Sequence, residues 1–91
     1  MTRPVQKILT DHVLWLENPA AGKRANLAGA TLKGATLQWA TLQWANLEGA
    51  NLEGATLEGA NLQWTTLEGA TLQWATLEGA TLKWATLKGA N

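Results

Sequence analysis

The stretch ANLEGANLEGATLEGANLQW, residues 45–64, decides the fold, because it consists of four consecutive units of five residues. Outward from this stretch the unit repeats thirteen times without interruption from Ala25, and Ala90-Asn91 begin a further copy. Leucine occupies the third position of every unit, and alanine occupies the first position of all but one, where Thr65 stands. The second position is always Asn or Thr, and the fifth is always Gly or Trp. Such regularity predicts a repeat architecture.

A period of five residues fits neither an α-helix, with 3.6 residues per turn, nor a plain alternating strand. The first and third residues of a unit share one side and are apolar, whereas the polar second residue points the other way, as in a short strand. The remaining two residues, such as Glu48-Gly49, then turn a corner. Four corners close a coil of twenty residues, in which Leu and Ala point inward.

The motif Ala-Asn/Thr-Leu-X-X resembles that of the pentapeptide repeat family, and the resemblance covers residues 25–91. It implies a right-handed quadrilateral β-helix whose coils stack about 4.8 Å apart through backbone hydrogen bonds. The predicted fold class is therefore all-β: a right-handed quadrilateral parallel β-helix (a β-solenoid) of about three coils with an N-terminal α-helical cap. Residues 25–91 are predicted to form one cooperative domain.

The corner residues predict two kinds of turn. In Leu47-Glu48-Gly49-Ala50 the third turn position is glycine, which adopts the positive φ of a type II turn freely. A tryptophan does not adopt a positive φ cheaply. Corners that end in tryptophan are therefore predicted to have another backbone geometry. These corners are Trp39, Trp44, Trp64, Trp74 and Trp84.

Residues 1–24 do not repeat and are predicted to form a helical cap and a hinge. The apolar side chains recur with the spacing of one amphipathic helix, with Pro4 at its first position and Asn18-Pro19 ending it. The residues at this spacing are Val5, Ile8, Leu9, His12, Val13 and Leu16, all apolar except His12. Such a helix would cover the exposed edge of the first coil. His12 is predicted to pack at the junction, and Trp15 to plug the first coil.

The last coil has no comparable cap in the sequence, which ends at Asn91. Leu77, Leu82 and Leu87 are therefore predicted to lie beneath an open edge. The family resemblance implies pairing of C-terminal ends, so a homodimer formed through these leucines is the predicted partner interaction. A monomer with a frayed end is the alternative.

The tryptophans form the candidate aromatic surface. A twenty-residue coil aligns Trp44, Trp64 and Trp84 in one outward column, whereas Trp39 and Trp74 fall on other corners. One hypothesis is a binding module that offers this column to planar or carbohydrate ligands. The other is a structural role, since each stacked pair contributes about 0.5–1.5 kcal/mol.

Composition excludes several classes of function. With no cysteine and one histidine, the chain offers no set of residues for a catalytic, cofactor-binding or metal site, and no enzyme activity is predicted. The formal net charge of zero argues against nucleic acid as a partner. It also argues against the topoisomerase-binding DNA mimicry known in the family, which needs an acidic surface. No obligatory ligand is predicted.

No apolar run approaches the roughly 20 residues of a membrane span, and the first residues lack an export leader, so no membrane association is expected. Localisation is left open, although expression in bacteria would be cytoplasmic. The chain has six Trp but no Ser, Tyr or Phe, a bias that indicates a designed, consensus-derived sequence. The sequence therefore predicts a structural scaffold that carries tryptophans at its corners.

Overall fold

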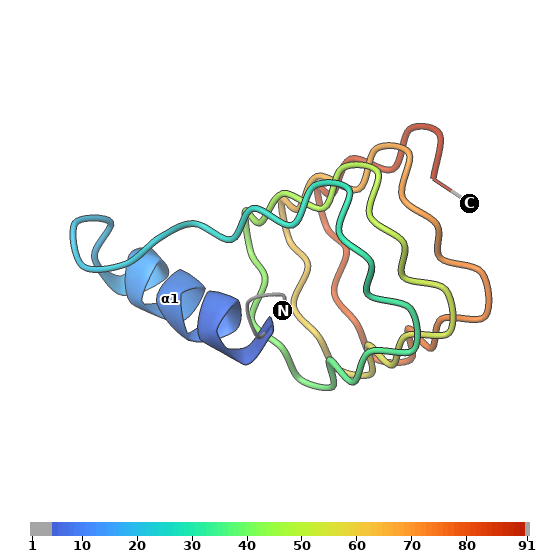
Figure 1. The fold of residues 1–91 in the computed structure, drawn as a ribbon, viewed down its shortest axis with the longest axis horizontal. Helices are drawn as coiled ribbons and strands as arrows, with labels where there is room; N and C mark the ends of the chain where they lie inside the picture. Colours follow the sequence, from blue (N-terminus) through green and yellow to red (C-terminus); the bar gives the residue numbers. More distant parts are fainter. Residues whose placement is uncertain (1–4, 91) are drawn as a thin grey trace.

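The computed structural model describes residues 5–90, so Pro4 and Asn91 lie outside the described residues. One helix, α1 (Val5–Glu17), precedes a chain that winds repeatedly around a common axis (Figure 1). The six residues whose spacing predicts a helix, from Val5 to Leu16, all lie within it. Each straight segment of the winding contributes a single paired residue, so the described residues form isolated bridges instead of longer strands.

The register between coils is twenty residues throughout. Each second-position residue from Asn26 to Thr66 forms a parallel bridge with the residue twenty positions later, as in Asn46↔Thr66. The hydrogen bonds run along the axis of the winding: the Leu47 N–H donates to the Thr66 carbonyl at 2.7 Å. The Asn46 N–H donates to the Ala25 carbonyl at 3.0 Å. The coil of residues 45–64 is therefore bonded to the coil before it and to the coil after it.

Every unit ends in a tight turn. The Ala50 N–H donates to the Leu47 carbonyl at 3.0 Å, and the equivalent bond closes each of the thirteen units. Because a coil takes twenty residues and a turn occurs every five, each coil has four corners. The corner glycine has a positive φ, 68° at Gly49, as the third position of a type II turn requires.

The prediction that tryptophan corners have a different backbone is wrong. Trp44 has a φ of 69°, and the other corner tryptophans lie between 62° and 65°. The reason is that a tryptophan corner is held as a glycine corner is. The Ala45 N–H closes the turn on the Leu42 carbonyl at 3.0 Å, and each corner is bonded to an adjacent coil, as from the Trp44 N–H to Gln63 at 3.0 Å or from the Gly54 N–H to Gln73, beside Trp74, at 2.8 Å. A left-handed residue costs about 1–2 kcal/mol, which the bonds and packing of the surrounding coils outweigh.

The interior of the winding is a column of leucine flanked by alanine. The side chains from Leu42 to Leu67 at the third positions are at most 1% exposed. Thr65, at the one non-alanine first position, is also fully buried, and its hydroxyl donates to the Leu42 carbonyl at 2.8 Å. None of the buried polar side-chain atoms among residues 5–90 lacks a hydrogen-bond partner.

Helix α1 lies against the first coil (Figure 1). Val5, Ile8 and Leu9 are partly buried and pack against the leucine core. The chain then returns close along the helix, because the Lys23 N–H donates to the Asp11 carbonyl at 3.1 Å. A Cβ on Gly22 would overlap backbone atoms of Asp11 and Trp15, so this return requires glycine. The hinge therefore fixes α1 over one end of the winding.

Candidate functional site

The column of Trp44, Trp64 and Trp84 is the largest aromatic arrangement of the described residues. The Trp44 and Trp64 rings are parallel within 2°, with centroids 4.9 Å apart. The Trp64 and Trp84 rings lie 15° from parallel at 5.4 Å. The twenty-residue register positions these residues on one corner, and the shared positive φ directs all three the same way.

The stacking limits what the column can bind. Both faces of the Trp64 ring are occupied by its neighbours, so a ligand lying along the column would meet ring edges. Sugar rings and planar dyes bind tryptophan through its face, and only the outer faces of Trp44 and Trp84 remain for that contact. The three rings therefore stabilise one another by stacking, and they do not offer a continuous flat surface to a ligand.

Polar and basic groups flank the column. Gln43 and Gln63 occupy the preceding position and approach each other at 3.5 Å, Nε2 to Oε1. The Lys83 ammonium lies 5.9 Å from the centroid of the Trp84 ring, within range of a cation–π interaction. At the other end, Arg24 donates from Nε to the Trp44 carbonyl, which ties the hinge to the column.

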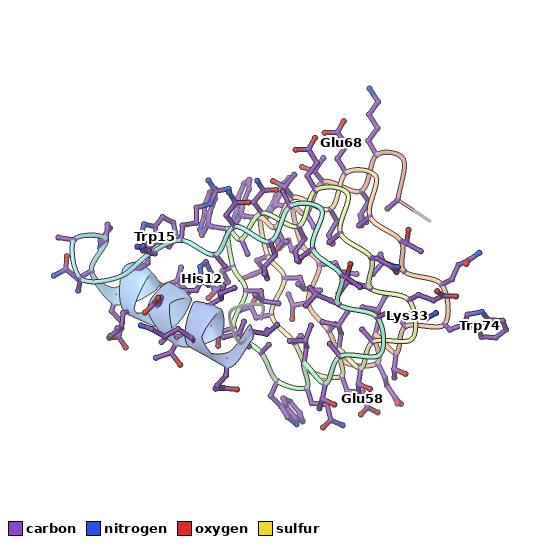
Figure 2. All side chains as sticks on the ribbon, in the orientation of Figure 1. His12, Trp15, Lys33, Glu58, Glu68 and Trp74 are labelled. Atoms are coloured by element: carbon purple, nitrogen blue, oxygen red, sulfur yellow. The ribbon has the colours of Figure 1, made fainter. Side chains whose placement is uncertain are left out.

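Trp39 and Trp74 are not brought to this column. The ring of Trp39 lies over Gly59, so that a Cβ at Gly59 would overlap ring atoms. The Gln38 amide beside it donates to Glu58 at 2.8 Å. Trp74 is 86% exposed and projects away from the coils (Figure 2). Both positions therefore carry a positive φ without a ring stacked above or below.

The predicted dimer face lies on the last coil. Leu77 and Leu82 are half-buried there, and Leu87 is 43% exposed. Within residues 5–90 the N–H groups of these leucines donate to no carbonyl, unlike those of the leucines in the preceding coils. Both apolar surface and unpaired donors are therefore present on this coil.

His12 is the fully buried polar residue of α1 and faces the first coil (Figure 2). Its Nδ1 accepts the Ala25 N–H at 2.9 Å, so the proton of the neutral ring is on Nε2. Nε2 donates to the Gln43 carbonyl at 2.7 Å. Burial lowers the pKa of His12 from 6.5, the Gln43 carbonyl acts to raise it, and the charge of Arg24 lowers it further.

Trp15 does not plug the first coil, so that prediction is wrong. The helical spacing directs it beside His12, where it is half-buried and stacks on the imidazole with centroids 5.6 Å apart. Ile8 and Leu9, both about two turns earlier, contact the core instead. The sequence indicates that His12 lies at the junction, but the two hydrogen bonds of its ring depend on where the hinge returns.

The outer surface carries few charge pairs. Lys33 and Glu53, twenty residues apart, form an ion pair at 3.8 Å. Among residues 5–90 no group of three or more His, Cys, Asp or Glu side chains is arranged to hold a metal ion. The single helix of that range, α1, is too short to cross a bilayer.

Parallel coils around a leucine core make this chain a β-helix repeat protein. It belongs to the pentapeptide repeat family: the model described as pentapeptide repeats matches in eight copies over residues 23–49, 37–73 and 57–91. This confirms the resemblance drawn from the motif and shows the fold to be a right-handed β-helix. Members of the family are generally structural proteins.

A solved structure agrees with this assignment. The chain is similar to a pentapeptide repeat protein of the Arabidopsis thaliana thylakoid lumen, with 30% identity and a TM-score of 0.61 over 74% of this chain and 61% of that one. It is also similar to HetL, a pentapeptide repeat protein involved in heterocyst differentiation regulation in the cyanobacterium Nostoc. There the identity is 35% and the TM-score 0.44 over 72% of this chain and 38% of that one. The chain thus spans less than two thirds of either structure. No curated protein matches it in sequence.

Proposed function

We propose that the chain is a structural scaffold: a four-sided coil of about three turns, capped at one end by α1 and derived from a consensus of the repeat. The observation that carries this proposal is the stacked column of Trp44, Trp64 and Trp84, whose ring faces are used by one another. The side chains that a binding module would present to a ligand are thus engaged in holding the coils together.

Three further features support a scaffold. The buried leucines repeat without a polar interruption other than Thr65, which is itself hydrogen-bonded. Seven basic and seven acidic residues balance, so the surface has no excess charge with which to attract nucleic acid or to imitate it. The thirteen near-identical units favour a consensus-derived origin.

A ligand titration tests the scaffold against the binding module. Intrinsic tryptophan fluorescence of the whole chain would be followed during addition of planar dyes and of oligosaccharides. A scaffold gives no saturable change with either. Saturable quenching that is lost in Trp84→Ala but kept in Trp74→Ala would instead assign binding to the column. Inhibition of gyrase supercoiling at micromolar protein would support DNA mimicry and contradict both.

We also infer self-association through the last coil. Leu77, Leu82 and Leu87 are partly exposed there, and their N–H groups are available to a second copy. Pairing of two such faces would bury apolar side chains and complete hydrogen bonds. Light scattering at high concentration tests this inference: a mass of twice 9.8 kDa supports it, and a mass of 9.8 kDa contradicts it. Leu87→Lys should return the dimer to the monomer, whereas Val13→Lys, on the exposed side of α1, should not.

A further inference from the structure

The contact between α1 and the first coil depends on a neutral imidazole. His12 lies on α1 and is fully buried, and its two ring nitrogens bond to two separate parts of the winding. Nδ1 accepts from Ala25, the first residue of the first coil, and Nε2 donates to Gln43, near the end of that coil. One side chain thus connects the helix to both ends of the same coil.

We propose that His12 makes the docking of α1 sensitive to acid: protonation of its ring releases α1 from the first coil while the coils remain wound. A proton on Nδ1 would face the Ala25 N–H, so the 2.9 Å hydrogen bond would become a contact between two donors. The ring would also carry a charge without access to water. Both effects oppose the docked arrangement and neither disturbs the helix itself.

The positive charge of the hinge acts in the same direction. Arg24, in the hinge, is the cation that opposes protonation of the ring, and Lys23 precedes it in the hinge. On α1, the neighbouring Asp11 carboxylate forms an ion pair with Lys7 at 3.0 Å. The first coil offers the uncharged Gln43 carbonyl. Burial and Arg24 together lower the pKa of His12 despite the bond to that carbonyl.

The remaining contacts of α1 are few, whereas the coils hold one another independently. Apart from His12, the helix contributes Val5, Ile8 and Leu9 to the core, and all three are only partly buried. The coils are joined by hydrogen bonds that involve no residue of α1, such as Leu47 to Thr66 at 2.7 Å. Loss of the His12 contacts should therefore open the helix end as a local event.

The experiment follows amide hydrogen exchange of the whole chain by NMR from about pH 7.5 to about pH 4.5, with rates corrected for intrinsic exchange. The His12 ring protons report its titration in the same samples. When the ring becomes charged, protection of Ala25 and of the α1 amides should fall at least about tenfold. Protection of Leu47 and Leu52, in the middle coils, should change by less than about threefold.

Three results would overturn the proposal: a ring that stays neutral throughout, helix protection that survives its protonation, or simultaneous loss of protection in α1 and the coils.

His12→Asn places an amide oxygen near Nδ1 without a titratable group, and α1 should then stay protected at every pH. If that variant does not dock at neutral pH, Arg24→Gln decides: removal of the charge should move helix release to higher pH. Arg24→Lys, which keeps the charge, should not, and equal behaviour of the two Arg24 variants would contradict the proposal.

Discussion

The indole of Trp64 lies parallel to that of Trp44 within 2°, although both residues hold a backbone conformation that disfavours large side chains. Stacking and backbone strain therefore oppose each other at the same residues. At Trp39 and Trp74 the strain is present, with φ of 63° and 65°, but no second ring is stacked on the first. Comparing these corners separates the two effects.

Removing the central ring should weaken the coils. Trp64→Ala keeps a left-handed non-glycine residue but loses two stacked pairs, so the free energy of unfolding should fall by about 1–3 kcal/mol. Trp74→Ala, at a corner with the same backbone and no stacked ring, should change it by less than about 0.5 kcal/mol. Urea denaturation followed by circular dichroism measures both, and equal losses would show that the column contributes no stability.

Glycine at the exposed corner should stabilise the chain. Trp74 is 86% exposed with a φ of 65°, so Trp74→Gly removes about 1 kcal/mol of backbone strain and little buried surface. The melting temperature should rise by a few degrees. Thermal denaturation of this variant beside Trp74→Ala provides the comparison. A lower melting temperature for the glycine variant would mean that the corner is not strained.

Alanine at two glycine corners should reveal the position of the Trp39 ring. Gly29 and Gly59 share a φ of 67°, but a Cβ meets no atom within 4 Å at Gly29 and overlaps Trp39 at Gly59. Both variants should lose about 1–2 kcal/mol of stability to backbone strain. Only Gly59→Ala should displace the indole, which would shift tryptophan emission to longer wavelength. In a Trp39→Ala background that spectral difference should vanish.

Thr65 should contribute through its hydroxyl. Thr65→Val keeps the shape but removes the 2.8 Å bond to the Leu42 carbonyl, which still accepts the Ala45 N–H at 3.0 Å. Because that acceptor stays satisfied, the loss should be only about 0.5–1.5 kcal/mol. Chemical denaturation gives the value. A loss above about 3 kcal/mol would indicate a misfit of the valine in the core.

Overall stability should decrease with acidification through His12. Its pKa in the folded chain lies below the ordinary value of 6.5, so the unfolded chain binds the proton more tightly. The free energy of unfolding should therefore fall as the pH drops below about 6.5, and this effect should level off below the folded pKa. Subtracting the pH profile of His12→Asn isolates the effect, and a difference that grows in the opposite direction would refute it.

Much of the architecture was predictable from the five-residue period, because Ala and Leu at fixed positions leave one inward face. The conformation of the tryptophan corners was not, since the local preference of a bulky residue points away from a positive φ. The bonds that hold that φ come from adjacent coils, as from Trp39 to Glu58 at 2.8 Å or from Gly54 to Gln73, beside Trp74, at 2.8 Å. These bonds involve residues of other coils, so the five residues of a single unit do not reveal them.

The candidate site, too, was predictable from the sequence only in part. The alignment of Trp44, Trp64 and Trp84 follows from counting residues, whereas the parallel rings depend on side-chain angles that no count provides. The position of Trp15 was misjudged because helical spacing does not say at which angle a helix crosses its neighbour. Gly22 is a signal that could have indicated the close return of the hinge.

The constant register of twenty residues also governs how this molecule could change in length. A duplicated block of four units would add one full coil, and the residues after it would keep the same corner of the winding. A single extra unit between Trp44 and Trp64 would still bury its alanine and leucine, yet it would rotate all later side chains by a quarter of the circumference. Trp64 and Trp84 would then stand above different corners from Trp44. In such a chain, the core would accept an insertion of any multiple of five residues. The alignment of the outward-facing side chains would survive only insertions that are multiples of twenty residues.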